Sequence, residues 1–401
     1  MEKLAIHGGT PVRSTYKVAN PQVTDAAKSD VLKVLEAGSL ASFYGGTKVR
    51  KFEHCFANWF GNQYGVAVNS GTSALHVAYL ASGIEEFSEV LVPANAYISA
   101  ISALIQCNLV PIIVDIDPKS WVMDPNDVKR KITQRTRAIV PVHMYGQPCP
   151  MNKLIDIARD HNLVVIEDCG QSHGGLWDDR LTGTFGLAAC FSICCRKHVT
   201  TGEGGVVITN SKSVADRARS LAHKGKGSGW FDYHEMGFSY NLTEMQAVLG
   251  LHGLSNLTIE VKKRQSFAVK LRNELEDLEL QFPFIPLRAS HAYFKFNFLL
   301  PSRLTSLRNE IVKALRCENV GADPCHPYVL TINWLRQQKP TLYSIIKQSN
   351  LPNYSLDTCL VAADVLSRQI GLELGPNLET EDIDYTIKAV RKVIGYYNRN
   401  L

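Results

Sequence analysis

Short runs of β-branched and aliphatic residues recur along the first half of the sequence, with stretches of helical character between them. The runs lie at residues 66–68, 90–92, 112–114, 139–142 and 164–166. Residues 73–81 and 150–160 have the pattern of helices, and Pro150 stands in the first turn of the second one. Because alternating strands and helices bury a sheet on both faces, the pattern predicts a mostly parallel α/β fold.

The second half of the chain has a different pattern. Two further runs, at residues 189–193 and 206–209, are separated only by a short polar loop that contains Lys197, so we expect them to pair directly. After Thr243 a long helical stretch begins, and strands and helices then mix. A chain of 401 residues is long for one hydrophobic core. We expect a large domain over residues 1–250, whose N-terminal segment can pack on the other domain, and a smaller α+β domain over residues 251–401.

Charge and apolar runs give no sign of a nucleic-acid or membrane partner. The formal net charge is +5 and the basic residues are scattered. No signal-peptide core opens the chain, and no apolar run reaches the roughly 18 residues expected of a membrane span. We therefore expect a cytoplasmic protein whose ten cysteines are reduced. Cys190, Cys194, Cys195 and His198 cluster in sequence, but their spacing matches no common zinc pattern.

A Ser-Gly-Thr-Ser-Ala segment at residues 70–74 joins the first strand to a helix. Such a junction points free backbone N–H groups and hydroxyls at one spot, where a phosphate can bind. Gly71 and Thr72 are the candidate phosphate-binding residues. Ser and Thr are also favoured at ordinary helix starts, so the segment is equally typical of a simple cap.

Asp168 stands where the run at residues 164–166 ends, and the carboxyl ends of strands are where open α/β sheets place ligands. An aspartate that faces a pyridine nitrogen keeps it protonated, which lets the ring accept electrons from a carbanion. The alternative is a hydrogen-bonded polar residue that closes a strand.

Lys197 lies between Ser192 and the glycine-rich segment 200–205. A lysine attacks a carbonyl only after losing its proton, and both burial and the neighbouring Arg196 would lower its pKa from about 10.4. Most lysines are solvated side chains without a catalytic role, which is the alternative here.

These segments occur together and in one order, and in this the chain resembles the DegT/DnrJ/EryC group of sugar aminotransferases, which are fold-type I pyridoxal-phosphate enzymes. The resemblance runs through nearly the whole chain. It is carried by residues 69–74, 92–97, 114–117, 141–147, 167–174 and 197–205. It implies a large α/β/α domain with a mostly parallel seven-stranded sheet and a smaller C-terminal α+β domain.

The resemblance also implies a role for individual residues. Lys197 would hold pyridoxal 5'-phosphate as a Schiff base and shuttle a proton, and Asp168 would pair with the pyridinium nitrogen. Gln171 would contact the phenolic oxygen of the cofactor, and Tyr97 would stack on its ring.

The cofactor phosphate would bind to Gly71, Thr72 and Ser192, because Ser192 stands five positions before the lysine as in the family. His173 would be structural. Around the lysine, the sequence Cys-Cys-Arg-Lys-His replaces the small or hydroxyl residues and the asparagine that are usual in the family.

A second departure lies in the segment Gly237 to Leu242, where the family commonly has an arginine and this chain has Asn241. In the family this segment reaches the active site of the neighbouring subunit. Ser239 can still donate one hydrogen bond to the cofactor. The loss of a bidentate arginine predicts a different mode of donor binding, with Lys224, Lys226 or Arg196 as the available cations.

The resemblance implies a homodimer with shared active sites that moves an amino group from glutamate or glutamine to a keto-sugar or keto-cyclitol. Residues 4–13 resemble the start of members that act on scyllo-inosose-type cyclitols. One alternative is a sugar dehydratase that uses the aminated cofactor, but such members replace the lysine by histidine. Another is a non-catalytic cofactor- or sugar-binding regulatory protein, against which the presence of Lys197, Asp168 and Gln171 together argues.

Overall fold

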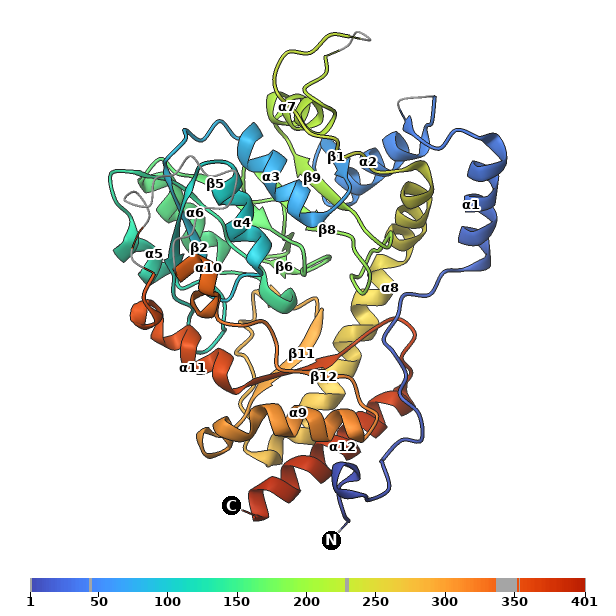
Figure 1. Ribbon diagram of the computed structural model, residues 1–401, viewed down its shortest axis with the longest axis vertical. Coiled ribbons are helices and arrows are strands. Elements are labelled where there is room, and N and C mark those ends of the chain that lie inside the picture. Colours follow the sequence, from blue (N-terminus) through green and yellow to red (C-terminus); the bar gives the residue numbers. More distant parts are fainter. Residues whose placement is uncertain (1, 43–44, 228–230, 337–351, 353, 401) are drawn as a thin grey trace.

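A seven-stranded sheet with strand order β1-β9-β8-β5-β4-β2-β3 forms the centre of the larger part of the molecule (Figure 1). The computed structural model describes residues 2–42, 45–227, 231–336, 352 and 354–400. All strands of this sheet are parallel except β9, which runs antiparallel to both of its neighbours. The strands are β1 (Tyr64–Val68), β2 (Glu89–Pro93), β3 (Val110–Val114), β4 (Thr136–Ile139), β5 (Val164–Asp168), β8 (Ala188–Ser192) and β9 (Gly205–Thr209).

Helices cover both faces of this sheet because alternate strand residues point to opposite sides. Val66 and Val68 belong to the apolar cluster under one set of helices, whereas Ala67 between them belongs to the cluster on the other face. The first set is α3 (Gly71–Ala81), α4 (Ile98–Gln106) and α7 (Lys212–Ala222). The opposite face packs against α2 (Lys48–Trp59), α5 (Pro125–Lys131), α6 (Met151–Asp160) and the start of α8 (Glu244–Leu275).

The predicted elements lie where expected, with differences at their ends. The runs at residues 189–193 and 206–209 pair directly and antiparallel, as predicted. Helix α3 begins two residues earlier than predicted because Ser70 already caps it, and Pro150 is the N-cap of α6 rather than a residue of its first turn. The strand predicted at residues 139–142 is wrong in its bounds, because β4 ends at Ile139 and the chain then bends toward β5.

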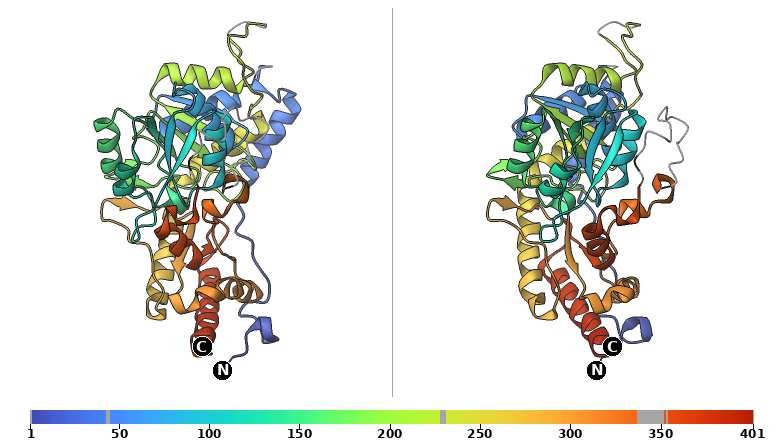
Figure 2. Two further views of the ribbon diagram at one scale, coloured as in Figure 1. Left: turned by 60° about the vertical axis from the view of Figure 1, so that its left-hand side comes forward. Right: turned by 90° about the vertical axis from the view of Figure 1, so that its left-hand side faces the viewer.

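A second sheet, with order β11-β13-β12, lies below the first in Figure 1. One of its faces packs on α9 (Arg308–Cys317), α12 (Thr380–Arg399) and the end of α8. The strands are β11 (Lys295–Leu299), β12 (Ala322–Asp323) and β13 (Gln369–Glu373). Leu4 and Ala19 of the N-terminal segment belong to the same apolar cluster, and Figures 1 and 2 show this segment running along the small sheet's side of the molecule.

The remaining described elements connect or flank these two sheets. Helix α1 packs against α8, and three two-residue strands form a small third sheet. These elements are α1 (Asp25–Ala37), α10 (Asn333–Arg336), α11 (Leu360–Arg368), β6 (Leu176–Trp177), β7 (Arg180–Leu181) and β10 (Ala289–Ser290). Among the described residues, no helix combines the length and the apolar character needed to cross a bilayer.

Helix α8 links the two large sheets. It begins at Glu244, where the Thr243 side chain and Gln246 cap each other's backbone N–H groups reciprocally. Its 32 residues run from the first sheet to the second, as both views of Figure 2 show. The domain boundary predicted at residue 250 falls inside this helix, and the division into two domains stays a prediction.

Candidate active site

Three parts of the chain meet at the carboxyl ends of β5 and β8: the start of α3 at Gly71, the residues 168–170 that end and follow β5, and Ser192 at the end of β8. Glycines allow them to approach closely. A Cβ atom added to Gly71 would lie 2.6 Å from the Cβ of Ser192. A Cβ on Gly170 would lie 3.1 Å from Asp168 Oδ1 and 3.4 Å from that same Ser192 carbon. The structure therefore brings Gly71, Ser192 and Asp168 together, as the sequence predicted, into a cradle that side chains would fill.

The first turn of α3 offers backbone donors to this cradle. Ser70 caps the helix by accepting the Ser73 N–H at 3.0 Å, so the capping interpretation of this segment is correct for Ser70. Gly71 and Thr72 follow as the first two helical residues, whose N–H groups have no acceptor within the helix. These two N–H groups and the positive end of the helix dipole favour an anion.

Asp168 is buried and Lys197 is half-buried, and the loss of water around each group opposes its charge. Desolvation raises the pKa of Asp168, although the Gly170 N–H at 3.0 Å from Oδ1 and the nearby Lys197 lower it. Desolvation likewise lowers the pKa of Lys197, which Cys194 and Asp168 partly offset. The Lys197 ammonium nitrogen lies 4.2 Å from the centre of the Phe294 ring. A lysine with a lowered pKa is the form that can attack a carbonyl.

The expected influence of Arg196 on this lysine is wrong. Arg196 binds Glu373 at 2.6 Å, and the cation that lowers the pKa of Lys197 is Lys295 of β11. Residue 196 has a positive φ of 74°, an uncommon backbone conformation for a residue other than glycine.

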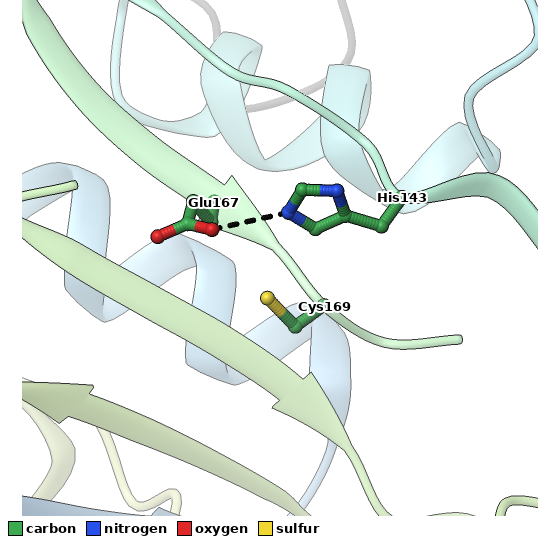
Figure 3. Close-up of side chains that lie close together, drawn as sticks. All are labelled: His143, Glu167 and Cys169. Atoms are coloured by element: carbon green, nitrogen blue, oxygen red, sulfur yellow. Dashed lines mark hydrogen bonds and ion pairs between the residues drawn. The ribbon is translucent and has the colours of Figure 1, made fainter. Parts of the chain in front are cut away.

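A second buried group lies behind Asp168, where His143, Glu167 and Cys169 come together (Figure 3). His143 Nδ1 accepts the Cys149 N–H at 3.0 Å, so Nε2 carries the proton and donates to Glu167 at 3.1 Å. The Glu167 carboxylate also accepts the N–H groups of residues 183, 185 and 186. With its oxygens filled in this way, Glu167 anchors a loop beneath the site, and no free lone pair points at a metal.

Gln171 and Tyr97 lie on the side of the site that faces the second sheet. Gln171 Oε1 accepts the Tyr145 N–H at 2.8 Å, so its amide nitrogen donates to His326 Nε2 at 3.3 Å. Tyr97 is 51% exposed, and its ring meets His326 edge to face with the ring centres 5.1 Å apart. Tyr145 stacks on His326 with the ring centres 5.5 Å apart.

Ser239 lies on the segment between α7 and α8 and is exposed. Its backbone forms a bridge with His223, and it makes no hydrogen bond or ion pair with the described residues around Asp168. Asn241, two residues on, bonds His223 through Oδ1 at 2.9 Å. Asn241, His223, Lys226 and Arg50 line a cavity of about 300 Å³ beside β1.

Three residues of the site were missed by the sequence analysis: Phe294, Lys295 and His326. They come from the second half of the chain and meet Lys197 and Gln171 only through the fold. One signal was present, because polar residues alternate with phenylalanines from Phe294 to Phe298, as on a strand with one polar face.

Many known proteins are similar to this chain in sequence. The GDP-perosamine synthase of Escherichia coli O157:H7 is 32% identical over 382 residues, which cover 94% of this chain and 97% of that protein. A protein of Streptoalloteichus tenebrarius, provisionally named an L-glutamine:3-amino-2,3-dideoxy-scyllo-inosose aminotransferase, is 37% identical over 61% of this chain and 60% of its own length.

A solved aminotransferase from Psychrobacter cryohalolentis superposes with a TM-score of 0.85 at 26% identity, covering 96% of this chain and 100% of that one. The sequence description of the DegT/DnrJ/EryC1/StrS aminotransferase family matches residues 21–391. The resemblance found in the sequence is therefore confirmed. This chain belongs to the DegT/DnrJ/EryC1/StrS family of pyridoxal-phosphate-dependent aminotransferases.

Proposed function

We propose that this enzyme holds pyridoxal 5'-phosphate on Lys197 and moves an amino group from glutamate or glutamine to a keto-sugar or keto-cyclitol. The observation that carries the proposal is the half-buried Lys197 near the buried Asp168, beside the glycine-lined cradle. When bound, the pyridine ring of this cofactor supplies an electron sink for the carbon that gains or loses the amino group.

The residues present fit this cofactor. Gly71 and Thr72 offer N–H groups to its phosphate, and Ser192 stands against Gly71 with its hydroxyl on the same side. Asp168 accepts a hydrogen bond through Oδ1 only, among the described residues, so Oδ2 can face the ring nitrogen. A protonated ring nitrogen would offset the burial that now raises the pKa of this carboxyl group.

Tyr97 and Gln171 complete the proposed cofactor site. The half-exposed ring of Tyr97 can stack on the cofactor ring. The Gln171 amide nitrogen has a second N–H beyond the one given to His326, and this N–H can reach the phenolic oxygen. The Lys197 amine would also move the proton at the carbon that gains or loses the amino group.

The names of relatives, which refer to perosamine and scyllo-inosose, support this class of acceptor. We assign the enzyme a cytoplasmic location and a homodimeric state in which Ser239 and Asn241 of one subunit lie at the site of the other. A cofactor site between two subunits needs a symmetric interface in which each chain completes the other's pocket.

The experiment that tests the proposal is the spectrum of the purified protein. With pyridoxal 5'-phosphate the wild type should absorb in the visible, and glutamate or glutamine should remove that band. The Lys197→Ala variant should lack the band, whereas Lys313→Ala, an exposed helical lysine, should keep it. If borohydride reduction and peptide mapping label another lysine, the assignment of Lys197 is wrong.

A further inference from the structure

The second sheet turns a polar face toward the proposed cofactor site. In β11, Phe296 and Phe298 belong to the apolar cluster beneath this sheet. Successive strand residues point to opposite faces, so Lys295 and Asn297 lie on the other side. Helices α9 and α12 cover the apolar face, which leaves the polar face for the molecule's interior.

Gly371 of β13 allows this polar face to form a compact group. It stands in register between Asn297 of β11 and Asp323 of β12. A Cβ atom there would lie 3.3 Å from Lys295 Cδ and 3.0 Å from Cys325 Sγ. Because the glycine has no side chain, Lys295 can lie across the strand and form an ion pair with Asp323.

This ion pair is adjacent to the residues of the site. The residue before Lys295 is Phe294, whose ring faces the Lys197 amine. Three residues after Asp323 is His326, which contacts Gln171 and Tyr97. The charge of Lys295 acts on two residues of the site, because it lowers the pKa of Lys197 and the pKa of His326.

The pair is held in place but remains accessible. The Lys295 side chain is 15% exposed and that of Asp323 is 22% exposed. Asp323 Oδ1 accepts the Cys325 N–H at 2.8 Å, which fixes the carboxylate. The Lys295 ammonium group has three N–H donors, and one of them binds Asp323 Oδ2. Further N–H groups of Lys295 and lone pairs of the Asp323 carboxylate therefore remain side by side on the polar face of the sheet.

The net charge of the pair decides which ligand it suits. A donor carboxylate would meet Asp323 as well as Lys295, and like charges in a partly buried site are costly. A hydroxyl group both donates and accepts, so neighbouring hydroxyls of one ring match a donor and an acceptor held side by side. Hydrogen bonds to charged groups are also stronger than those between neutral groups.

We propose that Lys295 and Asp323, with His326 beside them, bind adjacent hydroxyl groups of the neutral ring that carries the ketone or amine, and so select a polyhydroxylated acceptor. This inference rests on the proposed function, because it names the part of the site that reads the acceptor. The pair would contact the acceptor and not the donor, so its loss should impair the acceptor reaction more than the donor reaction, which Lys295 influences only through the pKa of Lys197.

The test separates the two half-reactions by the visible band of the bound cofactor. In the first series of measurements, the enzyme with bound cofactor is mixed with glutamate or glutamine, which gives the donor half-reaction. In the second series it is mixed with each of a panel of neutral amino polyols that includes scyllo-inosamine, which gives the acceptor half-reaction in reverse. Lys295→Gln and Asp323→Asn should each raise the amino-polyol concentration for half-maximal rate by about 10- to 100-fold, as expected for one lost hydrogen bond to a charged group. Asp323→Asn should leave the glutamate reaction within about twofold of wild type. Lys295→Gln removes a charge that acts on the pKa of Lys197, so it can change the glutamate reaction, but by less than the amino-polyol reaction.

The matched control is Lys270→Gln, which breaks a similar ion pair with Asp384 on the outside of α8 and should leave both reactions unchanged. If the variants at 295 and 323 leave the amino-polyol reaction unchanged, or impair the glutamate reaction more than the amino-polyol reaction, the inference is wrong while the proposed function stands. If wild type reacts with glutamate or glutamine but with no amino polyol of the panel, the proposed acceptor class fails and the inference with it.

Discussion

At the scale of single residues, the environment of Asp168 matters more than its identity. The carboxyl group is buried, and its Oδ1 accepts the Gly170 N–H. Burial raises its pKa, and Lys197 and His143 lower it. A cation placed opposite such a carboxylate is strongly stabilised, because little water screens the pair. This is the setting in which a ring nitrogen would stay protonated.

This setting gives a prediction for Asp168→Asn. The amide has nearly the same shape, so the protein should fold and bind the cofactor with its visible band present. The neutral amide cannot hold the ring nitrogen protonated, so the rate of the glutamate half-reaction should fall by about 100-fold or more. Stopped-flow absorbance measures that rate. A variant that reacts as fast as wild type would remove Asp168 from the proposed mechanism.

At the scale of elements, the sequence predicted those whose pattern is local. The strands of the large sheet are short apolar runs, and α8 begins with a capping box that is legible in Thr243 and Gln246. The two-residue strands β6, β7 and β10 carry no periodic signal and were not predicted. The approach of His326 to Gln171 joins residues 155 positions apart, which only the packing of the second sheet creates.

The segment between α7 and α8 departs in sequence from the family pattern, because Asn241 stands where the family commonly has an arginine. Its backbone continues the edge of the large sheet, because the Asn69 N–H donates to the Tyr240 carbonyl at 2.8 Å and Asn241 bridges to Val68. Asn241 thus occupies a fixed place beside the cavity that Arg50 and Lys226 also line. The cations near it are not the Arg196 of the sequence analysis, which binds Glu373.

For this segment we predict that Asn241→Arg strengthens donor binding. A guanidinium group can bind a carboxylate with two parallel hydrogen bonds, which an asparagine cannot match. The glutamate concentration for half-maximal loss of the visible band should fall by about tenfold, the value of one charged hydrogen bond. Asn241→Gln, which adds length without charge, is the control. If wild type already reacts at low glutamate concentration and Asn241→Arg changes nothing, this segment does not bind the donor.

At the scale of the whole molecule, the same segment projects from the body of the chain (Figure 1, yellow-green, top). It carries Phe231 and Met236, which are 86% and 84% exposed. Large apolar side chains gathered on a projection are typical of a surface that contacts another protein. The segment leads directly into Ser239 and Asn241. The proposed homodimer would bury these apolar side chains and, by the same contact, bring the two polar residues to the partner's site.

The dimer prediction is therefore tested on Phe231 and Met236 together. Burying a side chain of this size contributes about 1.5–3 kcal/mol, and a symmetric interface counts each one twice, so Phe231→Ser with Met236→Ser should weaken the dimer by well over about 100-fold. Light scattering over a dilution series should show dimer for the wild type and monomer for the variant, with activity lost as the monomer appears. The control is Leu287→Ser, which removes a fully exposed leucine outside this segment and should leave the dimer intact. A wild-type monomer that is stable and active would contradict both the shared site and the role of this segment, because a complete site in one chain has no need of residues from a partner.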